Sequence, residues 1–104
     1  MVDKPSQPGG EVLERTRPEV VDPTLYRVVL HNDDYSTMEF VIEVLETVFH
    51  KQPAEAYRIM LQVHTQQRGL CGVYPHEVAE TKTATVHEMA KAQGFPLRAS
   101  MEPE

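Results

Sequence analysis

The sequence predicts an α+β fold, a small sandwich in which a three-stranded antiparallel sheet packs against three helices in the order β-α-α-β-α-β. Segments rich in β-branched and aromatic residues are typical of strands, and they alternate with segments of helical apolar periodicity. The chain has 104 residues, of which 40% are hydrophobic and 25% charged, and it contains no internal repeat. This size suits one globular domain with one modest core.

The first part of the chain has the composition of a flexible tail. Residues 1–24 mix prolines, glycines and charged residues without any periodicity. Such a segment cannot bury enough apolar surface to offset the entropy lost on ordering. We therefore expect an N-terminal tail over residues 1–24 and a core domain over residues 25–104, and the core begins with a strand at Leu25–His31 (LYRVVLH).

A helix is predicted after the first strand, with its start near Ser36. Ser36 and Glu39 have the S-x-x-E spacing of a capping box, in which each side chain accepts from a free backbone N–H at the helix start. The helix is expected to end near His50, because Pro53 follows. Its apolar face is formed by residues at i, i+3 and i+4 spacing, namely Met38, Val41, Ile42, Leu45, Val48 and Phe49.

Pro53 suits the first turn of a second helix, since the N–H that it lacks needs no partner there. This helix is expected over residues 54–68 (AEAYRIMLQVHTQQR), and Gly69 is the signal for its C-cap. Residues 70–74 (LCGVY) then have the composition of a second strand.

The last elements are marked less sharply. Residues 75–80 (PHEVAE) fit neither pattern, and a third helix is expected over about residues 82–93 with Gly94 at its end. Its candidate N-cap residues are Thr81, Thr83 and Thr85. Residues 95–101 (FPLRASM) predict a final strand at a sheet edge, because Pro96 cannot donate to a ladder of hydrogen bonds.

The charge balance argues against nucleic acid as a partner. The net charge is −6, with 10 Lys and Arg against 16 Asp and Glu, and no cluster of basic residues appears in the sequence. No apolar run is long enough to span a bilayer, and the acidic N-terminus does not fit a signal peptide. The single cysteine, Cys71, excludes an internal disulfide and is typical of a reducing compartment, so we expect a cytoplasmic protein.

Three polar residues in a row stand between the first strand and the first helix: Asn32, Asp33 and Asp34. Asn and Asp favour turns, and acids near a helix N-terminus complement its dipole, so local turn chemistry explains them at the simplest level. With Ser36 as the expected cap, however, Asn32 and Asp34 are not needed for capping. They alternate along an extended segment and point to the same side, where they would hold a cation.

A second group of residues is expected near this corner. His64 follows Met60 by four residues, so the two share one face of the second helix. If that face packs against the first helix, Met38, Val41, Met60 and Val63 line an apolar recess with His64 at its rim. The simpler interpretation is that these apolar residues are core and that His64 is an ordinary surface or core histidine.

The sequence resembles the ClpS family, the adaptors of the bacterial N-end rule pathway. The resemblance covers about residues 25–104 and rests on the segments VLHNDDYSTMEFVIEVL, MLQVH, CGVYPHEVAETK and FPL. It implies a non-catalytic adaptor in the bacterial cytoplasm, without cofactor or metal. Its substrates would begin with Leu, Phe, Tyr or Trp, and its partners would be the AAA+ unfoldase ClpA and the protease ClpP, with no nucleic acid and no membrane.

The resemblance also implies residue roles. The α-amino group of the substrate is assigned to Asn32, Asp34 and His64, with Asp33 and Ser36 supporting the loop. The hydrophobic pocket is assigned to Met38, Val41, Met60, Val63 and Leu97, and the unfoldase interface to Glu77 and Lys82.

Three details of the resemblance have consequences of their own. Met38 would stand where a β-branched first residue collides with the pocket mouth, and the unfoldase would engage the tail. Ser36-Thr37 replaces a Thr-Pro pair that is frequent in the family, for which we expect only a small loss of stability.

Other functions compete with this interpretation. A cysteine hydrolase would use Cys71 with His64 or His76, although a cysteine within a strand suits a buried, inert thiol better. A metal site would use these residues with Asp34, but none of them has the close ligand spacing of known sites. The remaining alternative is a scaffold that binds a partner without reading its N-terminus.

Overall fold

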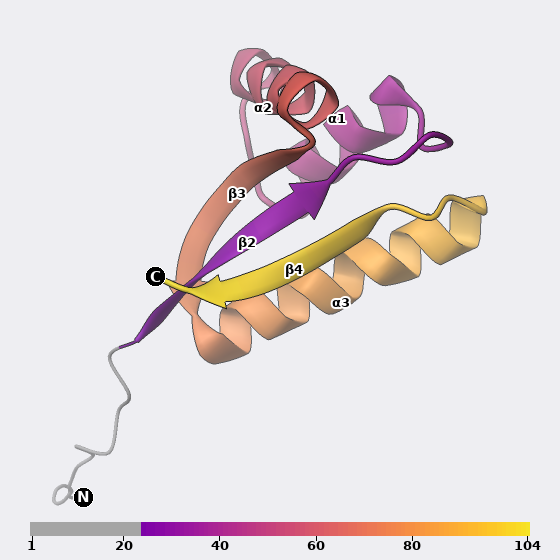
Figure 1. Ribbon diagram of the computed structural model, residues 1–104. Coiled ribbons are helices and arrows are strands. Elements are labelled where there is room, and N and C mark those ends of the chain that lie inside the picture. The colour runs from indigo at the N-terminus through magenta and orange to yellow at the C-terminus, as the bar shows by residue number, and fades with distance from the viewer. Residues whose placement is uncertain (1–23) are drawn as a thin grey trace, which may run out of the picture.

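The computed structural model describes residues 24–104, so the expected tail lies outside the described residues except for Thr24. The observed elements, in chain order, are β2 (Leu25–His31), α1 (Met38–Thr47), α2 (Pro53–Gln66), β3 (Arg68–Pro75), α3 (His76–Gln93) and β4 (Arg98–Pro103). The strands form one antiparallel sheet in the order β3-β2-β4. This architecture confirms the predicted fold class and element order (Figure 1).

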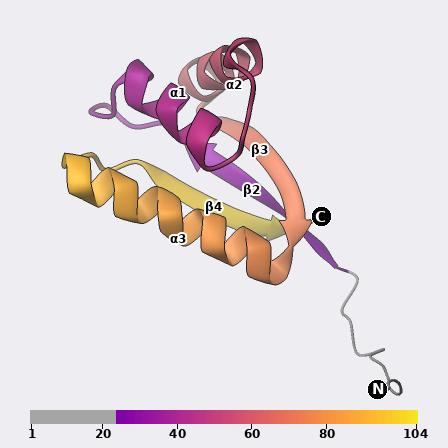
Figure 2. The ribbon, with the colours of Figure 1, turned by 180° about the vertical axis from the view of Figure 1, so that it is seen from behind.

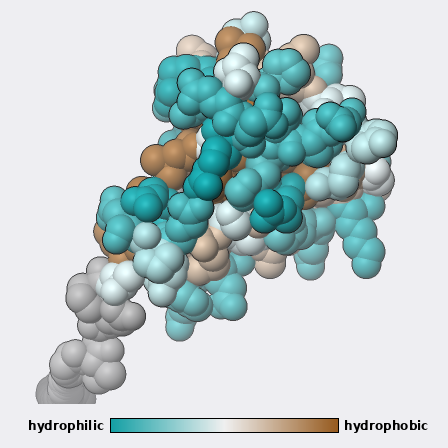
Figure 3. All heavy atoms as spheres, viewed as in Figure 1, coloured by the Kyte–Doolittle hydropathy of each residue, from teal (hydrophilic) through white to brown (hydrophobic). Residues whose placement is uncertain are grey.

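One hydrophobic core lies between the sheet and the helices. In the central strand β2, Val28 and Leu30 point into this core, while Arg27 and His31 alternate to the other face. Helix α3 runs along the sheet and contacts all three strands, whereas α2 packs on β3 and α1 packs on α2 (Figure 2). The face without a covering helix is mostly hydrophilic (Figure 3).

Helix α1 begins and ends differently from the expectation. Its N-cap is Thr37, whose Oγ1 accepts from the N–H of Phe40 at 3.1 Å, so the prediction of a Ser36 cap is wrong. The helix ends at Thr47 rather than near His50. The N–H of Lys51 closes back on the carbonyl of Leu45 at 3.0 Å, and His50 takes a left-handed conformation with φ 57°, as in a Schellman-type helix end.

Helix α2 starts at Pro53, as predicted, but its end is set by Gln67 and not by Gly69. Gln67 has φ 74°, in the left-handed region that stops a helix. Gly69 instead lies inside β3, which is longer than the expected 70–74 segment. The pairing with β2 shifts at Cys71, because Val28 faces Gly72 and Val29 faces Leu70. Cys71 is thus the extra residue of a β-bulge.

Helix α3 is longer than predicted. It starts at His76 with Pro75 as its N-cap, so residues 76–80 are helical and none of the three candidate threonines is the cap. No side chain caps this start. Gly94 ends the helix with φ 76°, as expected. Strand β4 starts at Arg98, after Pro96, instead of at residue 95. Among the described residues, no helix is long and apolar enough to cross a membrane.

Candidate functional site

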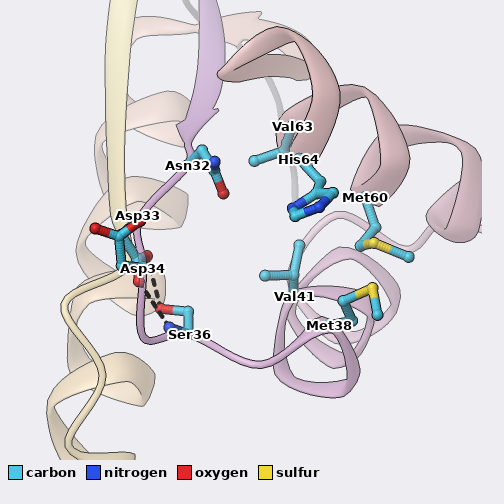
Figure 4. A pocket seen from close by; sticks show the side chains of 9 residues that line it. All are labelled: Asn32, Asp33, Asp34, Ser36, Met38, Val41, Met60, Val63 and His64. Carbon is cyan, nitrogen blue, oxygen red and sulfur yellow. Dashed lines mark hydrogen bonds between the residues drawn. The ribbon is translucent and has the colours of Figure 1, made fainter.

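A pocket of about 270 Å³ opens between the loop that follows β2, the start of α1 and the second half of α2 (Figure 4). Its lining residues are Asn32, Asp33, Asp34, Ser36, Met38, Val41, Met60, Val63 and His64. Segments about thirty residues apart in sequence therefore meet at one cavity, which is below the ~300–1,000 Å³ typical of drug-sized ligands.

Asp33 organises the loop on one side of the pocket. Its Oδ1 accepts from the N–H of Tyr35 at 2.7 Å and from that of Ser36 at 2.6 Å, and its Oδ2 accepts from Ser36 Oγ at 2.7 Å. Burial raises the pKa of the Asp33 carboxyl, but these hydrogen bonds from Ser36 and Tyr35 outweigh it, so the pKa is lowered overall. The local hydrogen bonds of this turn thus explain why an aspartate stands at position 33. They also engage the hydroxyl of Ser36 as a donor to Asp33.

Asn32 is held by the end of α2. Its backbone N–H donates to the carbonyl of Gln67 at 2.9 Å, and its Nδ2 donates to Gln67 Oε1 at 3.4 Å. With the amide nitrogen directed to Gln67, the amide oxygen of Asn32 faces the pocket (Figure 4). Gln67 is a supporting residue that no sequence pattern singled out, because neither its left-handed conformation nor its contact with Asn32 has a local signal.

The apolar part of the pocket comes from both helices. Val41 on α1 and Met60 and Val63 on α2 are buried and belong to the hydrophobic core. Met38, in the first turn of α1, is 54% exposed and lies opposite Met60 (Figure 4). Methionine is unbranched and adapts its shape, so this side of the pocket can adjust to different side chains.

The rim of the pocket is polar. Asn32 is partly buried, while Asp34 and His64 are exposed, and the imidazole of His64 points into the space between Asn32 and Val41 (Figure 4). Neither Asp34 nor His64 has a side-chain hydrogen bond or ion pair to another residue described in the structure. Their acceptor atoms therefore stay free for a ligand.

The structure does not place Leu97 among the lining residues. Leu97 is 4% exposed and packs in the hydrophobic core, at the connection between α3 and β4. Leu97 therefore stabilises the core and is not one of the residues that line the cavity.

Glu77 and Lys82 lie on α3, away from the pocket. Glu77 is exposed in the first turn. Lys82 is partly buried and its Nζ donates to the carbonyl of Val48 at 2.7 Å, at the end of α1. The same ammonium lies 5.9 Å from the centroid of the Phe49 ring and 5.2 Å from that of Tyr74. Lys82 thus ties α3 to the end of α1.

Cys71 is 1% exposed, and burial raises the pKa of its thiol to about 12. A thiol with such a pKa is a poor nucleophile at neutral pH. Within residues 24–104, the histidines, cysteine and acids form no group of three that could hold a metal ion. The residues considered for a metal site therefore form no such cluster in the described part of the chain.

Fold and pocket together define a small domain with a cavity that combines buried apolar side chains with amide, carboxylate and imidazole groups at its rim. The family model described as "ATP-dependent Clp protease adaptor protein ClpS" matches residues 21–100, and the chain belongs to this family. As a ClpS protein it is a Clp protease adapter.

Relatives support this assignment over the whole chain. The ClpS adapter of Desulfatibacillum aliphaticivorans is 54% identical over 104 residues, which is 100% of both chains. The ClpS adapter of Desulforapulum autotrophicum is 60% identical over 82 residues, or 79% of each chain. The structure of Agrobacterium tumefaciens ClpS2 bound to L-phenylalaninamide matches with a TM-score of 0.77 and 38% identity, covering 80% of this chain and 100% of that one. These relatives are named as adapters and not as enzymes.

Proposed function

We propose that this protein binds substrates by a free N-terminal residue with a bulky apolar side chain, namely Leu, Phe, Tyr or Trp. It then delivers them to a ClpA-type AAA+ unfoldase for degradation by ClpP. The observation that supports this most is the pocket, where buried apolar side chains adjoin unpaired polar groups at the rim. The ligand of the similar ClpS2 structure, L-phenylalaninamide, combines an aromatic side chain with a free amino group.

The polar rim suits an ammonium ion. The reference pKa of an α-amino group is about 7.7–8.0, so a free N-terminus is largely protonated at neutral pH and offers three N–H donors. We assign these donors to the amide oxygen of Asn32, the carboxylate of Asp34 and a ring nitrogen of His64. Acceptors from the loop and from α2 approach the ammonium from different sides, and Asp34 supplies the opposite charge.

Neither half of the pocket is sufficient alone. Burial of one large apolar side chain contributes about 1.5–3 kcal/mol, and a hydrogen bond to a charged group contributes a similar ~1.5–3 kcal/mol. Micromolar affinity needs about 8 kcal/mol beyond the costs of association. Two or three charged hydrogen bonds together with one buried side chain reach that range. Binding therefore requires both the free amino group and the apolar side chain of the first residue.

Met38 is the residue that we assign to size selection. It is the most exposed apolar residue of the pocket and stands at the mouth, opposite Met60. A side chain branched at Cβ is widest next to the substrate backbone, where it meets Met38. Leu, Phe, Tyr and Trp carry their bulk further out and pass this position.

For the unfoldase we assign Glu77 and Lys82. Glu77 is exposed at the start of α3. The ammonium of Lys82 has three donors, of which Val48 takes one, so two remain for a partner. We also propose the bacterial cytoplasm as the location, since Clp protease adapters of bacteria are the relatives found.

The test measures, by fluorescence anisotropy, the affinity of the full chain for a Phe-initiated peptide and for the same peptide with an acetylated N-terminus. Acetylation removes the charge, and it should weaken binding by about 100-fold or more, the equivalent of losing two charged hydrogen bonds. Asp34→Ala should reduce this difference, whereas Glu43→Ala, which removes an exposed carboxylate of α1 outside the pocket, should leave it unchanged. Equal affinity for the two peptides would favour a scaffold that ignores the N-terminus.

A further inference from the structure

A groove runs along the side of α2 that faces away from the pocket described above. It consists of two cavities of about 240 and 270 Å³, which share Gln62 and Leu70 in their lining and therefore adjoin. One cavity is lined by Arg27, Val29, Gln62, Gln66, Arg68, Gly69 and Leu70, and the other by Lys51, Glu55, Arg58, Gln62, Leu70, Cys71 and Gly72. No residue of the groove lines the first pocket.

Helix periodicity explains why α2 serves both places. Glu55, Arg58, Gln62 and Gln66 recur at three- and four-residue spacing, so they form one stripe beside β3. The residues that line the first pocket form a different stripe of the same helix. Ligands at the two places would thus contact different sides of α2 and would not exclude each other.

The other wall of the groove is a sheet edge. Strand β3 pairs only with β2 among the strands of residues 24–104, so its outer backbone groups have no strand neighbour there. Leu70, in the middle of the groove, is 42% exposed. An extended peptide can add to such an edge through backbone hydrogen bonds, while side chains of α2 contact it from the other wall.

The groove is positively charged on an acidic protein. Four cationic side chains line it, while the whole chain has a net charge of −6. Two carboxylates offset them in part, since Arg58 pairs with Glu55 at 2.6 Å and Glu102 pairs with both Arg68 and Arg27. Lys51 has no ion pair with any residue in the described part of the chain. The groove therefore keeps a net positive charge.

We propose that this groove binds an extended, acidic peptide segment of a protein partner, independently of the pocket for the substrate N-terminus. Charge complementarity selects acidic side chains. The amides of Gln62 and Gln66 both donate and accept, which matches peptide groups, and Leu70 offers an apolar contact. The acidic surface elsewhere disfavours a nucleic acid, which needs many phosphate contacts.

The probe for this groove is an N-acetylated, C-amidated peptide of alternating glutamate and threonine, about eight residues long, within the usual range of strand lengths. Acetylation keeps it from offering a free N-terminus. Titration into the ¹⁵N-labelled full chain should shift the amide resonances of residues 69–72 and of Gln62, and added salt should weaken the binding. The same peptide with glutamine in place of glutamate should bind more weakly.

The variant test uses K51Q and R58Q, each alone and both together, and K91Q on α3 controls for the loss of one exposed charge away from the groove. The double variant should bind the acidic peptide about fivefold more weakly, and K91Q should bind it as the wild type does. Dispersion of the amide resonances reports that each variant is folded. The proposal is overturned if residues 69–72 do not shift or the glutamine peptide binds equally well. It is also overturned if an oligonucleotide of the same charge shifts these residues at lower concentration.

Discussion

Asp33 is not assigned to the substrate ammonium ion, yet its removal should strongly disturb the geometry of the polar rim that binds this ion. Its carboxylate accepts three hydrogen bonds of 2.6–2.7 Å from Tyr35 and Ser36, and it lies between Asn32 and Asp34. Asp33→Ala removes all three bonds and leaves two backbone N–H groups to water. The loop that carries both flanking residues then loses its fixed shape.

The structure sets the size of this effect. A hydrogen bond to a charged group contributes about 1.5–3 kcal/mol when it is buried. The carboxylate of Asp33 is only partly buried, so solvent screening reduces the sum of its three bonds to about 2 kcal/mol. Because the rim then spends less time in its binding geometry, affinity for a Phe-initiated peptide should fall by about 10- to 30-fold, and about 2 kcal/mol sets the upper figure.

The lowered pKa of Asp33 adds a pH dependence whose sign is fixed. A carboxyl with a lower pKa in the folded state stabilises the fold fully above its unfolded pKa of about 3.9, and this contribution disappears as the pH falls through the folded pKa. The stability difference between wild type and Asp33→Asn should therefore be largest near neutral pH. It should shrink below about pH 4, as urea unfolding measures.

Peptide anisotropy and urea unfolding on Asp33→Ala check this reasoning, with Glu43→Ala as the control for charge. Glu43 is an exposed acid of α1 that does not line the pocket. Wild-type affinity in Asp33→Ala would refute the idea that this carboxylate positions the rim. If Glu43→Ala lost as much peptide affinity as Asp33→Ala, the effect would come from the change in net charge and not from the loop.

Three further predictions concern single residues. Met38→Ala should admit Val- and Ile-initiated peptides, measured as a smaller ratio of Phe to Val affinity, and an unchanged ratio would remove Met38 from size selection. Lys82→Met removes the hydrogen bond to Val48 and two ring contacts, so the free energy of unfolding should fall by about 2 kcal/mol and Tm by about 10 °C, while Lys91→Met stays near wild type. Cys71 should resist iodoacetamide at pH 8 in the folded chain and react in urea, because burial raises its pKa to about 12; rapid labelling of the folded chain contradicts a buried thiol.

Strong local patterns predicted the fold where the intrinsic preference of a segment and its tertiary packing favour the same helix or strand. The segment Leu25–His31, rich in β-branched and aromatic residues, is β2 with the predicted bounds, and Pro53 and Gly94 mark helix ends as expected. The Ser36 cap failed for a physical reason. Asp33 takes both the N–H and the hydroxyl of Ser36, so the capping role passes to Thr37, one residue later.

Tertiary contacts decided the features that the sequence did not reveal. Helix α3 starts at His76 without a side-chain cap, and Ala79 in its first turns is fully buried against the sheet. Gln67 fixes Asn32 through a contact between residues 35 positions apart. Leu97 was expected in the pocket because of the family resemblance, yet only the packing of the chain shows that it lies in the core.

The most direct test is a crystal structure of the full chain with a Phe-initiated peptide. We predict the phenylalanine ring in the cavity among Val41, Met60 and Val63, and the α-ammonium within about 2.7–3.2 Å of acceptors on Asn32 and Asp34, the normal range for such hydrogen bonds. A peptide bound through its middle, or with its amino group in solvent, would contradict recognition of the free chain end.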